Sequence, residues 1–459
     1  MGAIITLSLL AILVLYLGVF KAPKTLLPVS VLGLLVAGGF CVYLWAKPAE
    51  PLYSGMVLFD HFSLVFSLLM IGLTILIFIL SKGYFDSVGE HLAEYYALML
   101  FSLTGALIVV SFYNLSMLFI GIEIMSVALY ILAGIRKSDY ASNEASLKYF
   151  LMGAFSTGFL LFGIALLYGA TGSFGLREIQ SYVLNNGSQI SPMFYTGIIL
   201  LIVGLGFKIG AAPFHFWVPD VYDGSPILVT TFMSTVVKVA AIAAFLRLFW
   251  FCFEPLQEFW TPILITMSVV TLFIGNISAL VQQSFKRMLT YSSISHVGYM
   301  LFAILSIGGE SANAIFIYVG AYSLATIIAF GGLILVKRAH GGELYEAFNG
   351  LAKKNPFLAL TIAIAMLSLA GIPLTAGFIG KFMMFTAALS GYHIVLLVLA
   401  IINACIGIFY YFRVIVAMYF RSAEREAIYL DTNYKLVFGI AAILTILVGL
   451  YPAIISGIV

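Results

Sequence analysis

Charged side chains are scarce in this sequence: lysine, arginine, aspartate and glutamate make up 9% of its 459 residues, whereas hydrophobic residues make up 63%. A soluble domain of this length could not bury so much apolar surface, so the composition excludes the soluble classes and predicts a polytopic membrane protein. The net charge is only +3, and the basic residues lie in short segments between apolar runs. This pattern argues against a nucleic-acid partner.

Cysteine is also rare. Cys41, Cys252 and Cys405 lie far apart in apolar surroundings, which excludes an iron–sulfur cluster or a zinc site built from cysteines. We interpret them as small apolar residues of the interior. No basic segment precedes the first apolar run and no small-residue cleavage site is evident, so we predict a first transmembrane helix there rather than a signal peptide.

Apolar runs long enough to cross a bilayer as a helix recur along the chain. At about 20 residues per span, they predict an all-α polytopic fold with about fourteen transmembrane helices in a single membrane domain covering residues 1–459. The predicted spans are 2–20, 27–46, 56–81, 93–111, 114–135, 143–170, 192–217, 226–250, 261–281, 287–307, 312–336, 356–388, 392–420 and 434–456.

Basic residues predict the orientation of these spans, because cytoplasmic loops carry an excess of lysine and arginine. They fall in alternate loops, namely at Lys21, Lys24, Lys82, Arg136, Lys137, Lys286, Arg287, Lys337, Arg338, Lys353, Lys354, Arg421 and Arg425. The remaining loops hold little beyond Lys47 and Arg177. We therefore expect both termini on the periplasmic side of a bacterial cytoplasmic membrane, and an even number of spans agrees with this.

Ionisable residues inside the predicted spans are site candidates, because a charged side chain at the bilayer centre costs about 2.5–3.5 kcal/mol on insertion scales. Glu123 lies well inside the fifth span, and Lys208 and Lys238 lie near the middles of the seventh and eighth. A lone carboxylate in hydrocarbon would protonate, so we expect Glu123 to pair with Lys208. His296 lies near the middle of the tenth span among serine hydroxyls, which suits either a wet proton path or ordinary helix packing.

Three further charged residues lie nearer the ends of their spans. Glu144 and Lys148 are four residues apart at the start of the sixth span and share one helix face. They are either site residues or an interfacial ion pair that anchors the helix. Arg247 is about half a turn out of phase with Lys238 and close to the outer boundary, so we expect an interfacial anchor there.

Two spans combine a helix-breaking segment with a deep lysine. The seventh contains Pro213 between Lys208 and His215, and the twelfth contains Pro373 before Lys381. Proline lacks an N–H and interrupts helical hydrogen bonding, so we expect both spans to be broken. Interrupted helices in corresponding places point to a transport site. His215 then either acts beside Lys208 or caps the broken helix end.

The interrupted spans also suggest an internal repeat. Each is the fourth span in a block of five, the blocks covering residues 93–250 and 261–420. Because five is odd, the second block must be inverted in the membrane relative to the first. We predict two inverted five-helix repeats.

One long motif carries a resemblance to a known family. It reads GFKIGAAPFHFWVPDVYDGSP at residues 206–226, and Glu123 and Lys381 accompany it. With these features the chain resembles the antiporter-like membrane subunits of respiratory complex I, the proton-translocating NADH–quinone oxidoreductase. Within that family it is most similar to the subunit N group, because subunit M carries a glutamate where this chain has Lys381, and because the long C-terminal lateral helix of subunit L is not evident.

The resemblance implies proton translocation driven by redox chemistry in other subunits. The implied path uses Glu123 with Lys208, then Lys238 and His296, and Lys381 toward the exit. It also implies no redox cofactor and no metal in this chain, and partners that are a flanking antiporter-like subunit, small membrane subunits of complex I and the lipid bilayer. Two alternatives stay open, a subunit of a multi-subunit cation/proton antiporter and a structural membrane anchor that does not pump.

Overall fold

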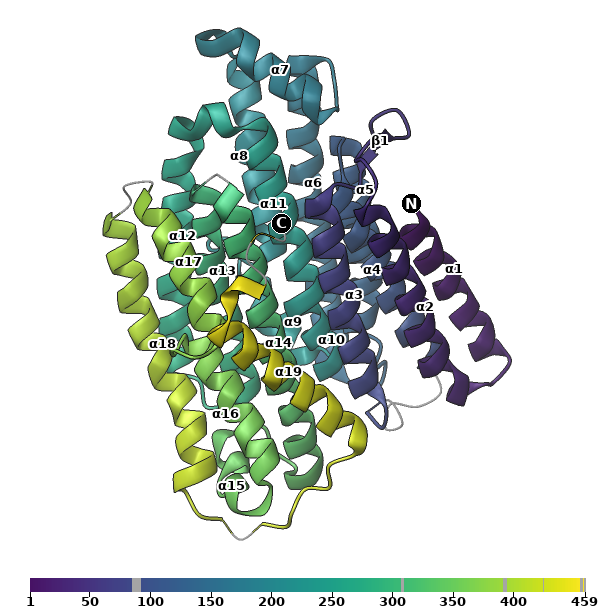
Figure 1. Ribbon diagram of the computed structural model, residues 1–459, viewed down its shortest axis with the longest axis vertical. Helices are drawn as coiled ribbons and strands as arrows, with labels where there is room; N and C mark the ends of the chain where they lie inside the picture. Colours follow the sequence, from purple (N-terminus) through teal and green to yellow (C-terminus); the bar gives the residue numbers. More distant parts are fainter. Residues whose placement is uncertain (85–91, 307–308, 391–393, 424, 455–456, 458–459) are drawn as a thin grey trace.

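The computed structural model describes residues 1–84, 92–306, 309–390, 394–423, 425–454 and 457 (Figure 1). This part of the chain is almost entirely helical. The helices are α1 (Gly2–Val19), α2 (Pro23–Trp45), α3 (His61–Ser81), α4 (Leu92–Ser111), α5 (Leu115–Ala133), α6 (Tyr140–Thr171), α7 (Leu176–Asn186), α8 (Pro192–Ile209), α9 (Trp217–Gly224), α10 (Ile227–Phe232), α11 (Lys238–Cys252), α12 (Gln257–Leu280), α13 (Phe285–Leu305), α14 (Gly309–His340), α15 (Leu351–Lys354), α16 (Pro356–Ala370), α17 (Ala376–Ser390), α18 (Ile394–Phe420) and α19 (Thr432–Leu450).

The predicted number of spans is confirmed. Thirteen helical segments of the described chain are long and apolar enough to cross a membrane, α10 and α11 counting as one because a π-helical turn at Met233–Val237 joins them. The shorter α16 and α17 are the two parts of the interrupted twelfth span and supply the fourteenth.

Polar residues at the ends of the apolar runs determine where several helices begin. The side chains of Asp60, Asn114, Asp139, Ser191 and Ser284 each accept a hydrogen bond from a backbone N–H in the first turn of the helix that follows. Such N-caps satisfy donors that have no partner within the helix. The third span therefore starts at His61, after its cap, and not at the predicted residue 56.

Two elements between the spans were not predicted. A short antiparallel hairpin, β1 (Pro51–Leu52) with β2 (Val57–Leu58), precedes α3 and packs on the turn between α4 and α5, where Tyr113 donates a backbone hydrogen bond to Met56. Helix α7 buries Leu176, Ile179 and Val183 and exposes polar residues between them. Figure 1 shows α7 beyond the ends of the spans, as expected for an amphipathic surface helix.

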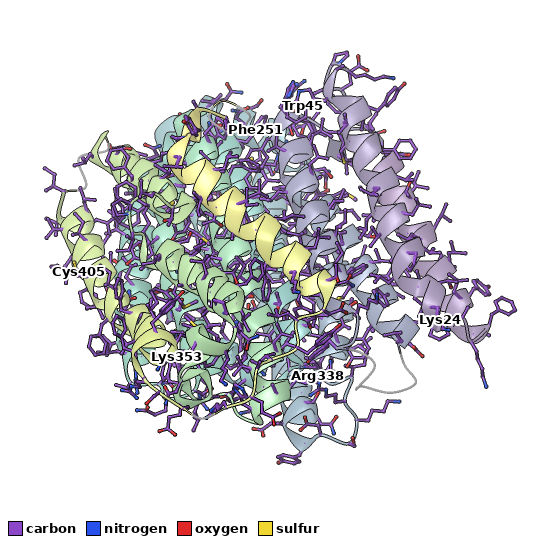
Figure 2. All side chains as sticks on the ribbon, turned by 60° about the horizontal axis from the view of Figure 1, so that its bottom comes forward. Lys24, Trp45, Phe251, Arg338, Lys353 and Cys405 are labelled. Atoms are coloured by element: carbon purple, nitrogen blue, oxygen red, sulfur yellow. The ribbon has the colours of Figure 1, made fainter. Side chains whose placement is uncertain are left out.

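The interior of the bundle lies around α10, α11, α13 and α14, which are almost wholly buried, whereas α1, α2, α6 and α18 expose apolar side chains. In Figure 1, α1 and α2 lie at one edge and α18 at the opposite edge. Figure 2 shows Lys24, Arg338 and Lys353 at one end of the molecule, with Trp45 and Phe251 at the other. The segregation of basic residues to one end follows the pattern of alternate loops in the sequence.

Candidate functional site

The seventh span is broken where the sequence predicts. Helix α8 ends at Gly210, whose φ of +76° lies in the left-handed region, and Ala211 donates a backbone hydrogen bond to Gly206. The next helix, α9, begins only at Trp217. Its indole N–H donates to the carbonyl of Phe207 at 3.0 Å, which also accepts the backbone N–H of Gly210, so a side chain adds to the hydrogen bonding at the break.

The twelfth span is broken in the same manner. Helix α16 ends at Gly371 with φ +82°, and Ile372 donates a backbone hydrogen bond to Leu367. Both breaks therefore use the glycine-ended turn that closes many helices. The lysines lie on opposite sides of their breaks, since Lys208 precedes the first glycine and Lys381 follows the second.

Four ionisable side chains of the predicted path are buried. The exposed fractions are 6% for Lys208, 4% for Lys238, 2% for His296 and 7% for Lys381. Each of these residues makes hydrogen bonds to neutral groups of other helical segments.

Lys208 is held by α5. Its Nζ donates to the hydroxyl of Ser126 at 2.6 Å, and that hydroxyl donates in turn to the carbonyl of Ile122. The ring of Tyr149 on α6 lies 5.7 Å from the amine and stacks on the indole of Trp217. The break in the seventh span and the lysine site are thus built from the same aromatic cluster.

Glu123 lies one helical turn before Ser126, on the same face of α5. Its Oε1 is buried and has no hydrogen-bond partner among the described residues. Among the described residues no direct ion pair joins Glu123 and Lys208, and the amine hydrogen bonds to Ser126. The pairing of the two charges stays a prediction.

Lys238 and His296 are joined through one turn of α13. Lys238 lies directly after the π-helical turn, a feature frequent at functional sites, and its Nζ donates to the carbonyl of Ser293 at 2.8 Å. His296 is three residues further along α13. Its Nδ1 lies 2.6 Å from the hydroxyl of Tyr318, and its Nε2 lies 2.9 Å from the hydroxyl of Tyr411.

Lys381 closes the second break. Its Nζ donates to the carbonyls of Leu369 and Ala370, each at 3.0 Å, which are among the last carbonyls of α16. A cation is favourable at this end of a helix because the carbonyls there lack partners and carry the negative end of the helix dipole. The ring of Tyr299 lies 4.8 Å from the amine.

The remaining predicted residues lie near the first break. His215 is buried within it, and its Nδ1 has no hydrogen-bond partner in the described part of the chain. The ion pair between Glu144 and Lys148 is present at 2.8 Å, and Asp220 of α9 joins it at 2.6 Å from the lysine. The side chains of Glu144 and Lys148 are substantially exposed on this chain, so this ion-pair cluster differs from the four buried side chains described above.

Arg247 anchors α11 more deeply than we expected. It is buried, forms an ion pair with Asp60 at the start of α3, and donates to the carbonyl of Val110 on α4 at 2.5 Å. The residue joins three helices, and among the described residues it forms no hydrogen bond or ion pair with the lysines of the path.

Lys286 was assigned to a loop but is buried in the first turn of α13. Its Nζ donates to the carbonyls of Asp223 and Ser225, the latter at 2.9 Å, and so caps the end of α9. Ser284, the N-cap of α13, is the sequence signal that could have placed Lys286 inside the helix.

Lys286 also lines a cavity of about 430 Å³ at the basic end of the molecule. Lys337 and Glu343 line the same cavity and form an ion pair at 2.8 Å. Burial raises the pKa of the Glu343 carboxyl, but Lys337 and the Ser284 hydroxyl lower it, so that its pKa lies below the usual value. This carboxyl therefore stays ionised beside a group of cations.

Comparison of the sequence with models of known protein families identifies the family of this chain. A family model described as NADH:quinone oxidoreductase/Mrp antiporter, transmembrane, matches residues 113–407, which is more than half of the chain. The chain belongs to this family.

Similar proteins cover the chain almost from end to end. NADH-quinone oxidoreductase subunit N of Cytophaga hutchinsonii is 41% identical over 99% of this chain and 98% of its own length. A chain of respiratory complex I from Thermus thermophilus with bound aureothin matches with a TM-score of 0.82 and 33% identity, covering 98% of this chain and 97% of that chain. A chain of the Mrp complex from Dietzia sp. matches with a TM-score of 0.88 over 99% of this chain and 95% of that chain, but at 17% identity this likeness shows the fold alone.

Proposed function

We propose that this chain is a proton-translocating membrane subunit of NADH–quinone oxidoreductase, of the subunit N type, and that it acts as one part of this translocase without redox chemistry of its own. The observation that carries the proposal is the burial of Lys208, Lys238, His296 and Lys381 inside the bundle. Retaining three lysines and a histidine inside a membrane domain is costly unless they are used, which argues against a purely structural anchor.

The contacts of the lysines suit proton transfer. Each amine is held by neutral oxygens, from Ser126, Ser293 or the end of α16, and no carboxylate among the described residues forms an ion pair with any of them. Because no fixed counter-charge locks the protonation state, a change in charge nearby can drive uptake or release. Glu123, with one buried unpartnered oxygen on the face of α5 that carries Ser126, is the carboxylate that acts on Lys208 in this proposal.

The two breaks divide the path in this proposal. Residues 93–250 and 261–420 form two inverted repeats, with Lys208 serving a path open to one side of the membrane and Lys381 a path open to the other. Lys238 and His296 connect them at mid-depth. The shared glycine-ended geometry at Gly210 and Gly371 supports this division.

The proposed setting is a bacterial cytoplasmic membrane, with both termini on the periplasmic side. The basic residues at one end of the molecule support this orientation. Fusion of alkaline phosphatase to the C-terminus should give an active reporter, and fusion of green fluorescent protein should give a dark one. The opposite pattern would reverse the orientation.

The function is tested in the assembled complex in inverted membrane vesicles. Lys208→Ala, Lys238→Ala, Lys381→Ala and Glu123→Gln should each reduce NADH-driven acidification per assembled complex, whereas Lys353→Ala, an exposed lysine of the basic end, should not. The complex should co-purify with flavin and iron–sulfur subunits. Normal acidification in all lysine variants would overturn the proposal, and acidification driven by a sodium gradient without NADH would replace it with cation/proton antiport.

A further inference from the structure

Both ring nitrogens of His296 are engaged by tyrosine hydroxyls from different helices. Tyr318 of α14 contacts Nδ1 at 2.6 Å, and Tyr411 of α18 contacts Nε2 at 2.9 Å. A neutral imidazole has one N–H donor and one acceptor nitrogen. One tyrosine must therefore donate to the ring while the other accepts from it, and exchanging the tautomer of the ring reverses both roles.

The two tyrosines connect His296 to different surroundings. The hydroxyl of Tyr411 also bonds the hydroxyl of Ser292, which precedes the carbonyl of Ser293 that holds Lys238. On the other side, Tyr318 packs against α17 so closely that a Cβ added at Gly380 would lie 2.8 Å from the Cα of Tyr318. Gly380 directly precedes Lys381, so Tyr318 belongs to a helix that packs on α17 beside this lysine.

We propose that Tyr411 and Tyr318 are relay residues of the proton path, and that the ring of His296 passes protons between them by exchanging tautomers. This proposal rests on the proposed function. It adds two residues to the path, Tyr318 and Tyr411. They lie far apart in the sequence, and the positions of the apolar spans do not predict that they meet.

The transfer balances as one proton entering and one leaving. A proton that reaches Ser292 adds to its oxygen as the Ser292 hydroxyl proton passes to Tyr411, and the Tyr411 hydroxyl proton passes to Nε2. The proton on Nδ1 then passes to Tyr318, and the Tyr318 hydroxyl proton leaves toward the neutral amine of Lys381. The ring is left with its proton on Nε2, and a reorientation of the side chain that turns Nε2–H toward Tyr318 and the free Nδ1 toward Tyr411 resets the relay without moving a further proton.

The test removes the hydroxyls while keeping the rings. Tyr318→Phe and Tyr411→Phe in the whole complex should lower NADH-driven acidification per assembled complex at least about tenfold, because a positioned acid–base group contributes about 10²–10⁴-fold to a proton transfer. His296→Gln should have a similar effect, since an amide can bond both tyrosines but cannot exchange tautomers as imidazole does. Tyr434→Phe is the control, because this buried tyrosine of α19 packs on Phe438 with ring centroids 5.9 Å apart.

The outcomes separate this proposal from the function on which it rests. If both phenylalanine variants acidify like wild type while Lys238→Ala does not, the hydroxyls are structural and the relay is overturned. If Lys238→Ala also acidifies normally, the proposed function itself has failed. Should a phenylalanine variant not assemble, 3-fluorotyrosine at position 411 keeps the hydroxyl but makes it more acidic. The pH profile of acidification should then shift. An unchanged profile would also overturn the relay.

Discussion

The Lys208 amine donates its hydrogen bond to the Ser126 hydroxyl at 2.6 Å, one helical turn beyond Glu123 on α5. The hydroxyl is itself bonded to the carbonyl of Ile122. Ser126 therefore fixes the amine at a defined place beside the carboxylate without neutralising it. A direct ion pair would hold the lysine charged, so this indirect arrangement is better suited to a group that must change its protonation state.

Ser126→Ala should weaken proton pumping without preventing assembly. The change removes a hydrogen bond to an ionisable group, which is worth about 1.5–3 kcal/mol, and leaves the amine less well positioned. We expect acidification between that of wild type and that of Lys208→Ala. Ser102→Ala is the matched control, because this buried serine of α4 also contacts α5, donating to the carbonyl of Met125 at 3.1 Å. Equal acidification in both serine variants would show that Ser126 only packs.

Arg247→Ala should reduce the amount of assembled complex rather than pumping by each complex. The arginine is buried and paired with Asp60, which is 31% exposed at its side chain. Removing one partner of a buried pair costs about 3 kcal/mol at the lower end of the measured range, and the partial exposure of Asp60 favours that end. Native gels should show less assembly for Arg247→Ala, whereas Lys238→Ala should assemble and fail to pump. Loss of pumping in fully assembled Arg247→Ala would place the arginine in the path.

The spans and their breaks were predictable from the sequence because they depend on local properties. An apolar run of sufficient length forms a membrane helix, and a glycine followed closely by a proline, as at Gly210 with Pro213 and Gly371 with Pro373, is a local signal for a helix end. The hairpin before α3 escaped notice because its two strands are only two residues each. The π-helical turn before Lys238 carries no sequence pattern that we could use.

The contacts of the site were less predictable, since they depend on how distant helices pack. Charge alone predicts that Glu123 pairs with Lys208, but it does not predict that Ser126 accepts the hydrogen bond of the amine. Tyr318 and Tyr411 reach His296 from helices far along the chain, and in the sequence they are two among 26 tyrosines. The division into two inverted repeats stays a prediction.

The loop of the second break should be covered by a neighbouring subunit. Leu374 has a positive φ of +73° and is 65% exposed on this chain, and α19 packs against its backbone through Gly449. Non-helical backbone at membrane depth is tolerated only where protein or a water-filled cavity surrounds it. A partner of the complex therefore has to occupy this face.

Cysteine labelling can test this cover. In a background where the exposed Cys405 is replaced by serine, Leu374→Cys should react with a lipid-soluble maleimide in the isolated full-length subunit and be protected in the assembled complex. Leu32→Cys, similarly exposed but on the continuous helix α2, reports the effect of assembly on an ordinary helical position. Equal reactivity of position 374 in both states would mean that lipid covers the loop.

Gly371→Ala should disable Lys381 without touching the lysine itself. An added Cβ would lie 2.8 Å from Cδ and 3.2 Å from Nζ of Lys381, so the lysine side chain would have to shift, and we expect this to disturb its bonds to the carbonyls of Leu369 and Ala370. The positive φ of +82° adds strain of about 1–2 kcal/mol for alanine.

Gly172→Ala separates the two effects, because Gly172 ends α6 with φ +72° and an added Cβ there meets no atom within 4 Å. Both variants should lose similar stability in thermal unfolding, but only Gly371→Ala should lose acidification to the level of Lys381→Ala. If the two variants pump equally, the contact between Gly371 and Lys381 has no part in proton transfer, and the position of the amine at the end of α16 serves only to close the break.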